Sequence, residues 1–330
     1  MKKGILKNLA LFFVSMLLIL IFLEASARIS YPLYSDYNTE MWRYASQIKM
    51  SSDLPNLSHV HRPYSKGDFY GTDVLINSDG FRDYEYSVQK ENSTYRILLL
   101  GDSVTFGWGV KFNDTFAKRL EMRLNAEKPS KKYSKYEIIN TGVGNYNTVM
   151  ESTTLKYKGL KYSPDLVILN YYINDAEPVP KKPFELLRYS YAYAFLWSKY
   201  QNAKVLFLKG FDYKIYYHNL YKGENPGRNK AEAALKDVID MAKKNKAKIL
   251  IVVYPEFHNF KNYEFNETTA FVSEISSSKN APVLDLLPYY VNYEPSSVWV
   301  SFEDVHPNSL GHEIAANAIY EKLIKLKLIS

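Results

Sequence analysis

Ser103 has the clearest chemical setting of any residue in this sequence. The strand-like run Arg96–Leu100 ends at Gly101-Asp102-Ser103, and the residues after Trp108 return to helical spacing. An apolar run of this length that stops at a glycine is typical of a strand buried on both faces. Ser103 would then lie on a strand-to-helix turn, where free N–H groups and the dipole of the following helix can stabilise negative charge. The pattern predicts a nucleophilic serine.

Three further polar segments could act together with such a serine. The loop 140–148 is dense in Gly and Asn, which tolerate positive φ and leave backbone N–H groups free. Asn174 follows another apolar run, and Asp304 and His306 precede the last helical segment. A serine, an amide donor, a loop with free N–H groups and an acid close to a histidine are the parts of an acyl-transfer site.

Alternating strands and helices must position these segments. We expect five strands, at Arg96–Leu100, Tyr136–Asn140, Leu166–Tyr171, Ile249–Val253 and Val283–Leu286. Helical spacing is found at Thr115–Ala126, Thr148–Lys158, Ala231–Asn245, Thr268–Ser278 and Ser309–Lys327, with a long excursion from Glu177 to about Arg228. The alternation predicts a three-layer α/β/α sandwich with a five-stranded parallel sheet. Ligands bind such sheets outside the carboxyl ends of the strands, which is where Ser103 falls.

Residues 1–27 form a separate N-terminal segment. Three lysines, at positions 2, 3 and 7, precede the apolar run Leu9–Leu23, which approaches the roughly 20 residues that span a bilayer. We expect a transmembrane helix with its lysines in the cytoplasm and the rest of the chain on the extracytoplasmic side. The alternative is secretion after signal cleavage, because Ala25-Ser26-Ala27 matches a signal peptidase site. We favour a retained anchor because the apolar run is long for a signal peptide.

Residues 28–94 form an irregular lead-in, rich in Tyr, Ser, Asp and Pro, which we expect to pack on a catalytic domain of residues 95–330. His59 and His61 within it could ligate a metal, but no carboxylate or third histidine stands at a supporting spacing. We therefore interpret this histidine pair as part of a polar loop and predict no metal site.

The composition excludes several classes of function. The sequence has no cysteine, so disulfides, thiolate metal sites and a cysteine nucleophile are impossible. Its net charge is +7, but the lysines are spread along the chain and mixed with acids, which indicates a solvated surface and not a nucleic-acid-binding one. Thirty tyrosines would suit sugar binding, although packing in the core and on the surface accounts for them more simply.

From about Tyr95 to Leu328 the chain resembles the SGNH/GDSL-type hydrolases. Gly101-Asp102-Ser103 resembles the family's first block, which supplies the nucleophile and one oxyanion N–H. In the second block the position whose glycine gives another N–H is Asn145 here, and asparagine visits left-handed conformations readily. Tyr172-Ile173-Asn174-Asp175 resembles the third block, with tyrosine where glycine is usual, and keeps the amide of Asn174. His306 resembles the catalytic base.

The acid of the triad departs from the family's usual pattern. That acid lies three residues before the histidine, at Glu303, whereas Asp304 lies two residues before it. Some branches of the family, among them secreted polysaccharide acetyltransferases, resemble the Asp-x-His spacing. We expect Asp304 to orient His306, with Glu303 as the alternative. Many relatives also carry an upstream motif like Asn77–Arg82, which implies that the lead-in belongs to the same domain.

The resemblance implies a serine esterase that hydrolyses O-acyl esters, in particular O-acetyl esters of an extracytoplasmic glycan, through an acyl-enzyme on Ser103. One alternative is a polysaccharide O-acyltransferase of the same fold, working beside a membrane-bound acyl-transfer or export partner. Another is a catalytically weak carbohydrate-binding module in polymer export. Retention of Ser103, Asn174 and His306 together favours catalysis. The chemistry needs no metal or organic cofactor, and we expect an ester substrate and a membrane as partners, with no nucleic acid.

Overall fold

The computed structural model describes residues 2–181, 188–207 and 212–329. The chain divides into two compact units, Met1–Ser46 with Pro183–Phe211, and Gln47–Lys182 with Asp212–Ser330. The expected lead-in is therefore divided, since residues 28–46 belong to the first unit and residues 47–94 to the second. The excursion expected after Glu177 enters both units, and residues 182–187 and 208–211 of it lie outside the described residues.

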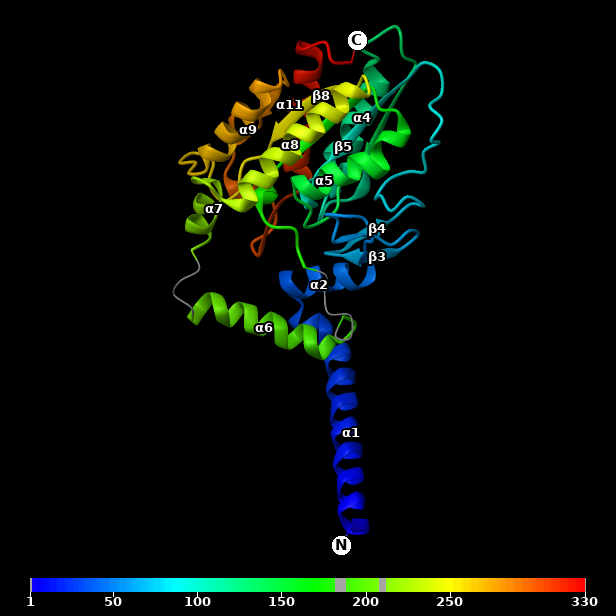
Figure 1. The fold of residues 1–330 in the computed structure, drawn as a ribbon, viewed down its shortest axis with the longest axis vertical. Helices are drawn as coiled ribbons and strands as arrows, with labels where there is room; N and C mark the ends of the chain where they lie inside the picture. Colours follow the sequence, from blue (N-terminus) through cyan, green and yellow to red (C-terminus); the bar gives the residue numbers. More distant parts are fainter. Residues whose placement is uncertain (1, 182–187, 208–211, 330) are drawn as a thin grey trace. The chain divides into compact units, whose positions relative to one another are not determined.

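The second unit is built on a five-stranded parallel sheet (Figure 1). The strand order is β6-β5-β7-β8-β9, and every neighbouring pair is parallel. All five predicted strands are present: β5 (Thr94–Leu100), β6 (Lys135–Asn140), β7 (Leu166–Tyr171), β8 (Lys248–Val253) and β9 (Val283–Asp285). Every residue of β5 is buried, as expected for a central strand covered on both faces.

Helices cover both faces of this sheet (Figure 1). One face carries α4 (Phe116–Glu127) and α11 (Ser309–Lys325), and the other carries α5 (Thr148–Thr154), α8 (Pro226–Lys244) and α9 (Asn266–Ser278). Alternate residues of β5 join different cores: Ile97 and Leu99 pack with α4, whereas Leu98 and Leu100 pack with α8. The arrangement confirms the predicted three-layer α/β/α fold.

Short elements complete the second unit. They are the helices α3 (Ser103–Phe106), α7 (Tyr213–Tyr221) and α10 (Leu287–Tyr290), and the antiparallel pairs β1 (Lys49–Ser51) with β2 (His59–His61), β3 (Lys66–Phe69) with β4 (Thr72–Leu75), and β10 (Trp299–Ser301) with β11 (Asp304–Pro307). The prediction of a polar loop at His59 and His61 was wrong, because both lie buried in β2. Burial is possible because each imidazole bonds a backbone carbonyl, of Gly144 and Gly80 respectively.

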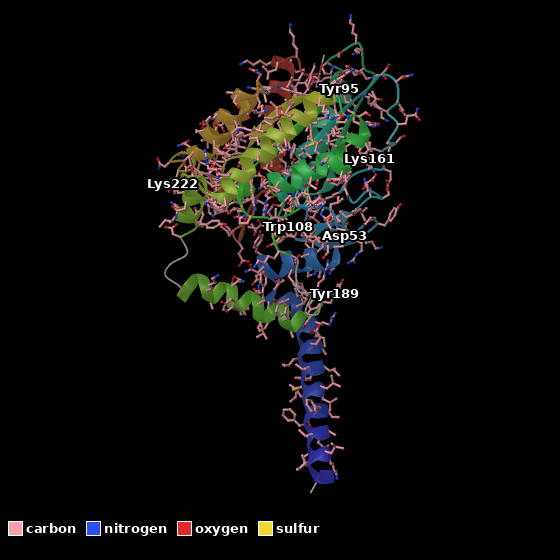
Figure 2. All side chains as sticks on the ribbon, in the orientation of Figure 1. Asp53, Tyr95, Trp108, Lys161, Tyr189 and Lys222 are labelled. Atoms are coloured by element: carbon pink, nitrogen blue, oxygen red, sulfur yellow. The ribbon has the colours of Figure 1, made fainter. Side chains whose placement is uncertain are left out.

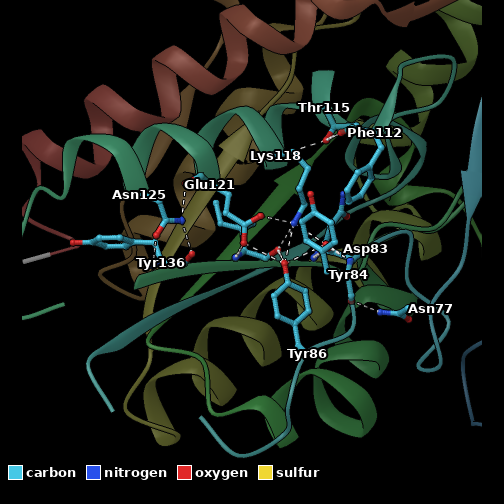
Figure 3. A network of polar contacts seen from close by, with 12 residues as sticks. Asn77, Asp83, Tyr84, Tyr86, Phe112, Thr115, Lys118, Glu121, Asn125 and Tyr136 are labelled. Carbon is cyan, nitrogen blue, oxygen red and sulfur yellow. Dashed lines mark hydrogen bonds and ion pairs between the residues drawn. The ribbon is translucent and has the colours of Figure 1, made fainter. Parts of the chain in front are cut away.

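A buried ionic cluster ties residues 83–86 to α4 and β6 (Figure 3). Lys118 Nζ lies 2.6 Å from Asp83, and the other oxygen of Asp83 accepts a hydrogen bond from the N–H of Asn140, the last residue of β6. The Tyr86 hydroxyl donates to the Ile138 carbonyl. Burial raises the pKa of Asp83 to about 6, even though Lys118 opposes that shift. The cluster fixes this part of the lead-in where β6 enters the loop after Asn140.

The first unit contains α1 (Lys2–Tyr34), α2 (Tyr37–Gln47) and α6 (Tyr191–Phe207). Among the described residues, α1 is the helix long and apolar enough to cross a membrane. Glu24, which follows its apolar run, accepts hydrogen bonds from the Ser190 hydroxyl at 2.8 Å and from the N–H groups of Tyr191 and Ala192 at 3.1 Å. Because the first N–H groups of a helix have no partner within it, the Glu24 carboxylate serves as an N-terminal cap for α6.

Candidate active site

Ser103 is the first residue of α3 and follows β5 directly, as the sequence pattern predicts. The Asp102 side chain caps this helix by accepting a hydrogen bond from the Val104 N–H at 2.8 Å. Ser103 Oγ lies 2.8 Å from His306 Nε2, and His306 Nδ1 lies 2.5 Å from Asp304 Oδ1. A carboxylate only accepts hydrogen bonds, so Nδ1 carries the proton and Nε2 is free to accept from the serine.

Asp304 and Glu303 have different surroundings although they are adjacent. The Asp304 side chain is 1% exposed, and its second oxygen accepts a hydrogen bond from Trp108 Nε1 at 2.7 Å. Glu303 lies on the exposed turn between β10 and β11. The structure therefore joins Asp304, and not Glu303, to the imidazole of His306.

The charges at the site favour a basic imidazole. Burial alone would lower the pKa of His306, but the charge and hydrogen bond of Asp304 outweigh it and the pKa is raised. For Asp304, burial favours a higher pKa, but His306 and the hydrogen bonds to the carboxylate prevail and lower it. An ionised carboxylate beside a more basic imidazole suits proton abstraction from a hydroxyl.

Three donors lie at the same edge of the sheet and could bind an oxyanion. Among the described residues, no hydrogen-bond acceptor is paired with the backbone N–H of Ser103 or of Asn145. Asn145 is exposed and has φ of +65°, a left-handed conformation that glycine and asparagine favour. Asn174 Nδ2 lies 3.2 Å from Asp102 Oδ2, which orients the amide so that its N–H₂ group, and not its oxygen, faces the carboxylate.

Close packing holds the loop of Asn145 against the serine helix. A Cβ added to Gly142 would lie 2.5 Å from the backbone nitrogen of Phe106, a distance that real Cβ atoms do not show. The glycine is required here because two backbone segments approach each other closely.

Two residues that support the site were missed by sequence reasoning. Trp108 is buried, donates to Asp304, and stacks on Phe69 with ring centroids 5.8 Å apart. Figure 2 shows Trp108 and Tyr95, the latter near the start of β5, at opposite ends of the sheet unit. Arg82, the last residue of the upstream motif, donates to the carbonyls of Gly107 at 2.6 Å and Val110 at 2.8 Å. Its position at the end of that motif, and the tryptophan between two glycines, were the available signals.

A serine, histidine and aspartate in hydrogen-bond contact at the carboxyl edge of a parallel sheet define an acyl-transfer type of site. Residues 99–314 match the model of the GDSL-like lipase/acylhydrolase family, and this match covers more than half of the chain. The chain belongs to this family and is a carboxylic ester hydrolase.

Among solved structures, the chain is similar to several esterases at low identity. The acetyl xylan esterase AlAXEase is 18% identical, with 69% of this chain and 99% of that chain covered and a TM-score of 0.46. A catalytic mutant of the acetylxylan esterase Axe2 from Geobacillus stearothermophilus is 16% identical, with 71% and 96% covered and a TM-score of 0.46. Esterase EstA from Pseudoalteromonas sp. is 16% identical, with 70% and 98% covered and a TM-score of 0.45. Among curated proteins, none matches the sequence.

Proposed function

We propose that this protein is a serine esterase that removes O-acyl groups, chiefly acetyl groups, from a glycan outside the cytoplasm. The observation that carries the proposal is the series of hydrogen bonds from Ser103 Oγ to His306 and from His306 to Asp304. This arrangement can deprotonate a hydroxyl at neutral pH because the histidine accepts the proton and the aspartate stabilises the resulting charge.

In the first half-reaction, Ser103 Oγ attacks the ester carbonyl while its proton passes to His306 Nε2. The N–H groups of Ser103 and Asn145 and the amide of Asn174 stabilise the tetrahedral oxyanion. His306 then returns the proton to the departing sugar oxygen, the ester bond breaks, and the acyl group remains on Ser103.

In the second half-reaction, His306 deprotonates a water molecule that attacks the acyl-enzyme. The same donors stabilise the second oxyanion, and the proton on His306 returns to Ser103 as the carboxylic acid leaves. Asp304 stays ionised throughout and keeps the imidazole in the required tautomer.

The accessibility of the nucleophile supports a small acyl group. Ser103 is 7% exposed and the His306 side chain is 16% exposed. An acetyl group needs little room, and the rest of a large hydroxylated substrate can stay outside the site.

The contacts of Glu24 support a retained membrane anchor. Cleavage after Ala27 would remove Glu24 and with it three hydrogen bonds to the start of α6. It would also remove the Ala27 carbonyl, which accepts a hydrogen bond from the Tyr34 hydroxyl. With lysines at positions 2, 3 and 7 in the cytoplasm, the ester hydrolase unit would lie on the extracytoplasmic side.

The test uses the full-length protein in detergent and a fluorophosphonate probe, which reacts with activated serines. We expect labelling of the parent and none of Ser103→Ala at an equal melting temperature. Labelling of Ser103→Ala to the same extent would contradict the assignment of the nucleophile.

Acetylated oligosaccharides are then screened with and without an acceptor sugar. Acetate release supports hydrolysis, whereas acetyl groups recovered on the acceptor would reassign the protein as an acyltransferase.

A further inference from the structure

The β1–β2 hairpin lies against the loop that carries Asn145. Lys49 pairs with His61 and Ser51 with His59 across the two strands, so their side chains share one face of the hairpin. Lys49, His59 and His61 are all buried. Tyr146, in the loop, donates its hydroxyl to the His59 carbonyl at 2.9 Å, and its ring meets the His59 ring edge to face. Figure 2 shows Asp53, in the turn of this hairpin, at the same end of the unit as Trp108.

Lys49 and His59 both bond the carbonyl oxygen of Gly144. Lys49 Nζ donates to it at 2.6 Å, and His59 Nε2 lies 3.0 Å from it. Burial, followed by the charge of Lys49, lowers the pKa of His59 well below its usual value, so its imidazole is neutral. Its Nδ1 faces the Ser58 hydroxyl at 2.8 Å and can accept from it, which leaves Nε2 as the N–H donor to Gly144.

Burying the lysine ammonium group of Lys49 costs free energy that a donor to the Gly144 carbonyl does not require. Burial lowers the pKa of Lys49 to about 7, a sign of how strongly its surroundings oppose the charged form. A hydroxyl or a water molecule would satisfy the same carbonyl without burying a cation. Lys49 Nζ also donates to the side-chain oxygen of Asn145 at 3.3 Å, so it contacts both residues that share one peptide group.

That peptide group joins Gly144 to Asn145, and its geometry links the carbonyl to the proposed oxyanion donor. In a trans peptide the C=O and the following N–H point in opposite directions within one plane. The structure contains no cis peptide bonds in its described residues. Fixing the Gly144 oxygen between Lys49 and His59 therefore directs the Asn145 N–H away from the hairpin. Donors on the carbonyl also polarise the peptide, which makes its N–H a stronger hydrogen-bond donor.

We propose that Lys49 and His59 are positioning residues of the oxyanion hole, which act by holding the Gly144 carbonyl so that the Asn145 N–H faces the reacting oxygen. The inference rests on the proposed function, because it assumes that Asn145 supplies an oxyanion donor for chemistry on Ser103. The inference gives His59 and Lys49 a role in the reaction, although neither touches the substrate.

The test compares donor-removing with donor-retaining variants on a chromogenic acetyl ester. Lys49→Met and His59→Leu remove a donor, while His59→Gln keeps an N–H near the same place. His61→Leu is the matched control, because it removes a buried imidazole from the same face of the same strand, and the Nδ1 of that imidazole lies against the Gly80 carbonyl. Loss of an oxyanion-hole donor costs about 10²–10³-fold in kcat. We expect kcat to fall about 10–100-fold in Lys49→Met and in His59→Leu, with KM within about twofold, and His59→Gln to recover part of the loss.

The rate of fluorophosphonate labelling provides a second readout, because its phosphoryl oxygen occupies the oxyanion hole. We expect this rate to fall in parallel with kcat. The inference is overturned if Lys49→Met and His59→Leu keep the parent kcat, if KM rises while kcat is unchanged, or if His61→Leu loses as much kcat as His59→Leu. These outcomes leave the esterase proposal standing as long as the parent is labelled and Ser103→Ala is not. If the parent itself is not labelled, the proposed function fails first, and this inference fails with it.

Discussion

At the residue scale, the choice between Asp304 and Glu303 depends on which carboxylate is buried beside the histidine. Asp304 is almost fully buried and accepts hydrogen bonds from His306 and Trp108. Glu303 is exposed, so water screens its charge from the site. Glu303 lies on the turn before β11, whereas Asp304 is the first residue of that strand, two residues before His306.

Replacing these two acids should therefore have unequal effects. Loss of the orienting carboxylate costs up to about 10⁴-fold in a serine protease, because the imidazole loses its required tautomer. We expect kcat/KM on an acetyl ester to fall by about 10³–10⁴-fold in Asp304→Asn and by less than about tenfold in Glu303→Gln. The opposite ranking would assign the role to Glu303, and two mild effects would indicate a Ser103–His306 dyad.

The pH dependence of kcat/KM should reflect the interaction of His306 with Asp304. His306 must be neutral to accept a proton, and its pKa is raised by Asp304. In the parent, kcat/KM should thus rise with pH through a midpoint above the usual histidine value of about 6.5. In Asp304→Asn the midpoint of this rise should shift to lower pH, because the negative charge that raises the pKa of His306 is gone. A midpoint that does not move between the two proteins would show that Asp304 does not act on His306.

At the element scale, the segment between α3 and α4 is held in place by hydrogen bonds from the lead-in. Arg82 donates to the carbonyls of Gly107 and Val110, on either side of Trp108. Gly107 has φ of +79°, and its N–H donates to the carbonyls of Ser103 and Val104 in the first turn of α3. The motif that ends at Arg82 thus supports the tryptophan that donates a hydrogen bond to Asp304.

Arg82→Met should affect both stability and activity. It leaves the Val110 carbonyl without its donor and removes one of the two donors to the Gly107 carbonyl, and an unpaired buried acceptor costs about 1–3 kcal/mol. We expect the free energy of unfolding of the second unit to fall by about 2–5 kcal/mol, measured by urea unfolding in detergent, with a lower kcat at temperatures where the variant is folded. Lys236→Met is the control, because the partly exposed Lys236–Glu232 pair on a helix surface is worth no more than about 0.5 kcal/mol. Similar losses in both variants would mean that Arg82 has no special supporting role.

At the scale of the whole molecule, the N-terminal helix is part of a folded unit. Beyond its apolar run, α1 caps α6 through Glu24, and Tyr31 and Tyr34 contact Tyr191 and Phe195 edge to face. These contacts lie on both sides of Ala27, where the alternative of signal cleavage would cut the chain. A chain cut there would lose part of the support for α6.

We therefore expect the mature protein to keep its N-terminus and to expose the ester hydrolase unit outside the cytoplasm. Protease added to intact spheroplasts should digest that unit, and N-terminal sequencing of the mature protein should not begin at Arg28. A unit that resists protease until lysis would refute the topology, and a mature chain starting at Arg28 would identify a secreted enzyme.

Local patterns in the sequence determined much of this protein. The five sheet strands, their parallel arrangement and the placement of Ser103 and Asn174 after strand ends follow from apolar runs, turn residues and helical spacing, all of which act over a few residues. The antiparallel pair β10–β11, which contains His306, was not predicted. The apolar length of α1 was equally evident, because membrane spanning depends on composition and length.

The tertiary structure alone decided which distant residues support the site. Trp108 meets Asp304 across 196 residues, and Lys49 meets Gly144 across 95. No periodicity marks such pairs, because they form only when segments far apart in the sequence pack together in the folded chain. The burial of His59 was not predicted for the same reason. A polar side chain such as histidine is expected on the surface unless its hydrogen bonds are satisfied, and here the Gly144 carbonyl, from another segment, accepts the hydrogen bond of His59.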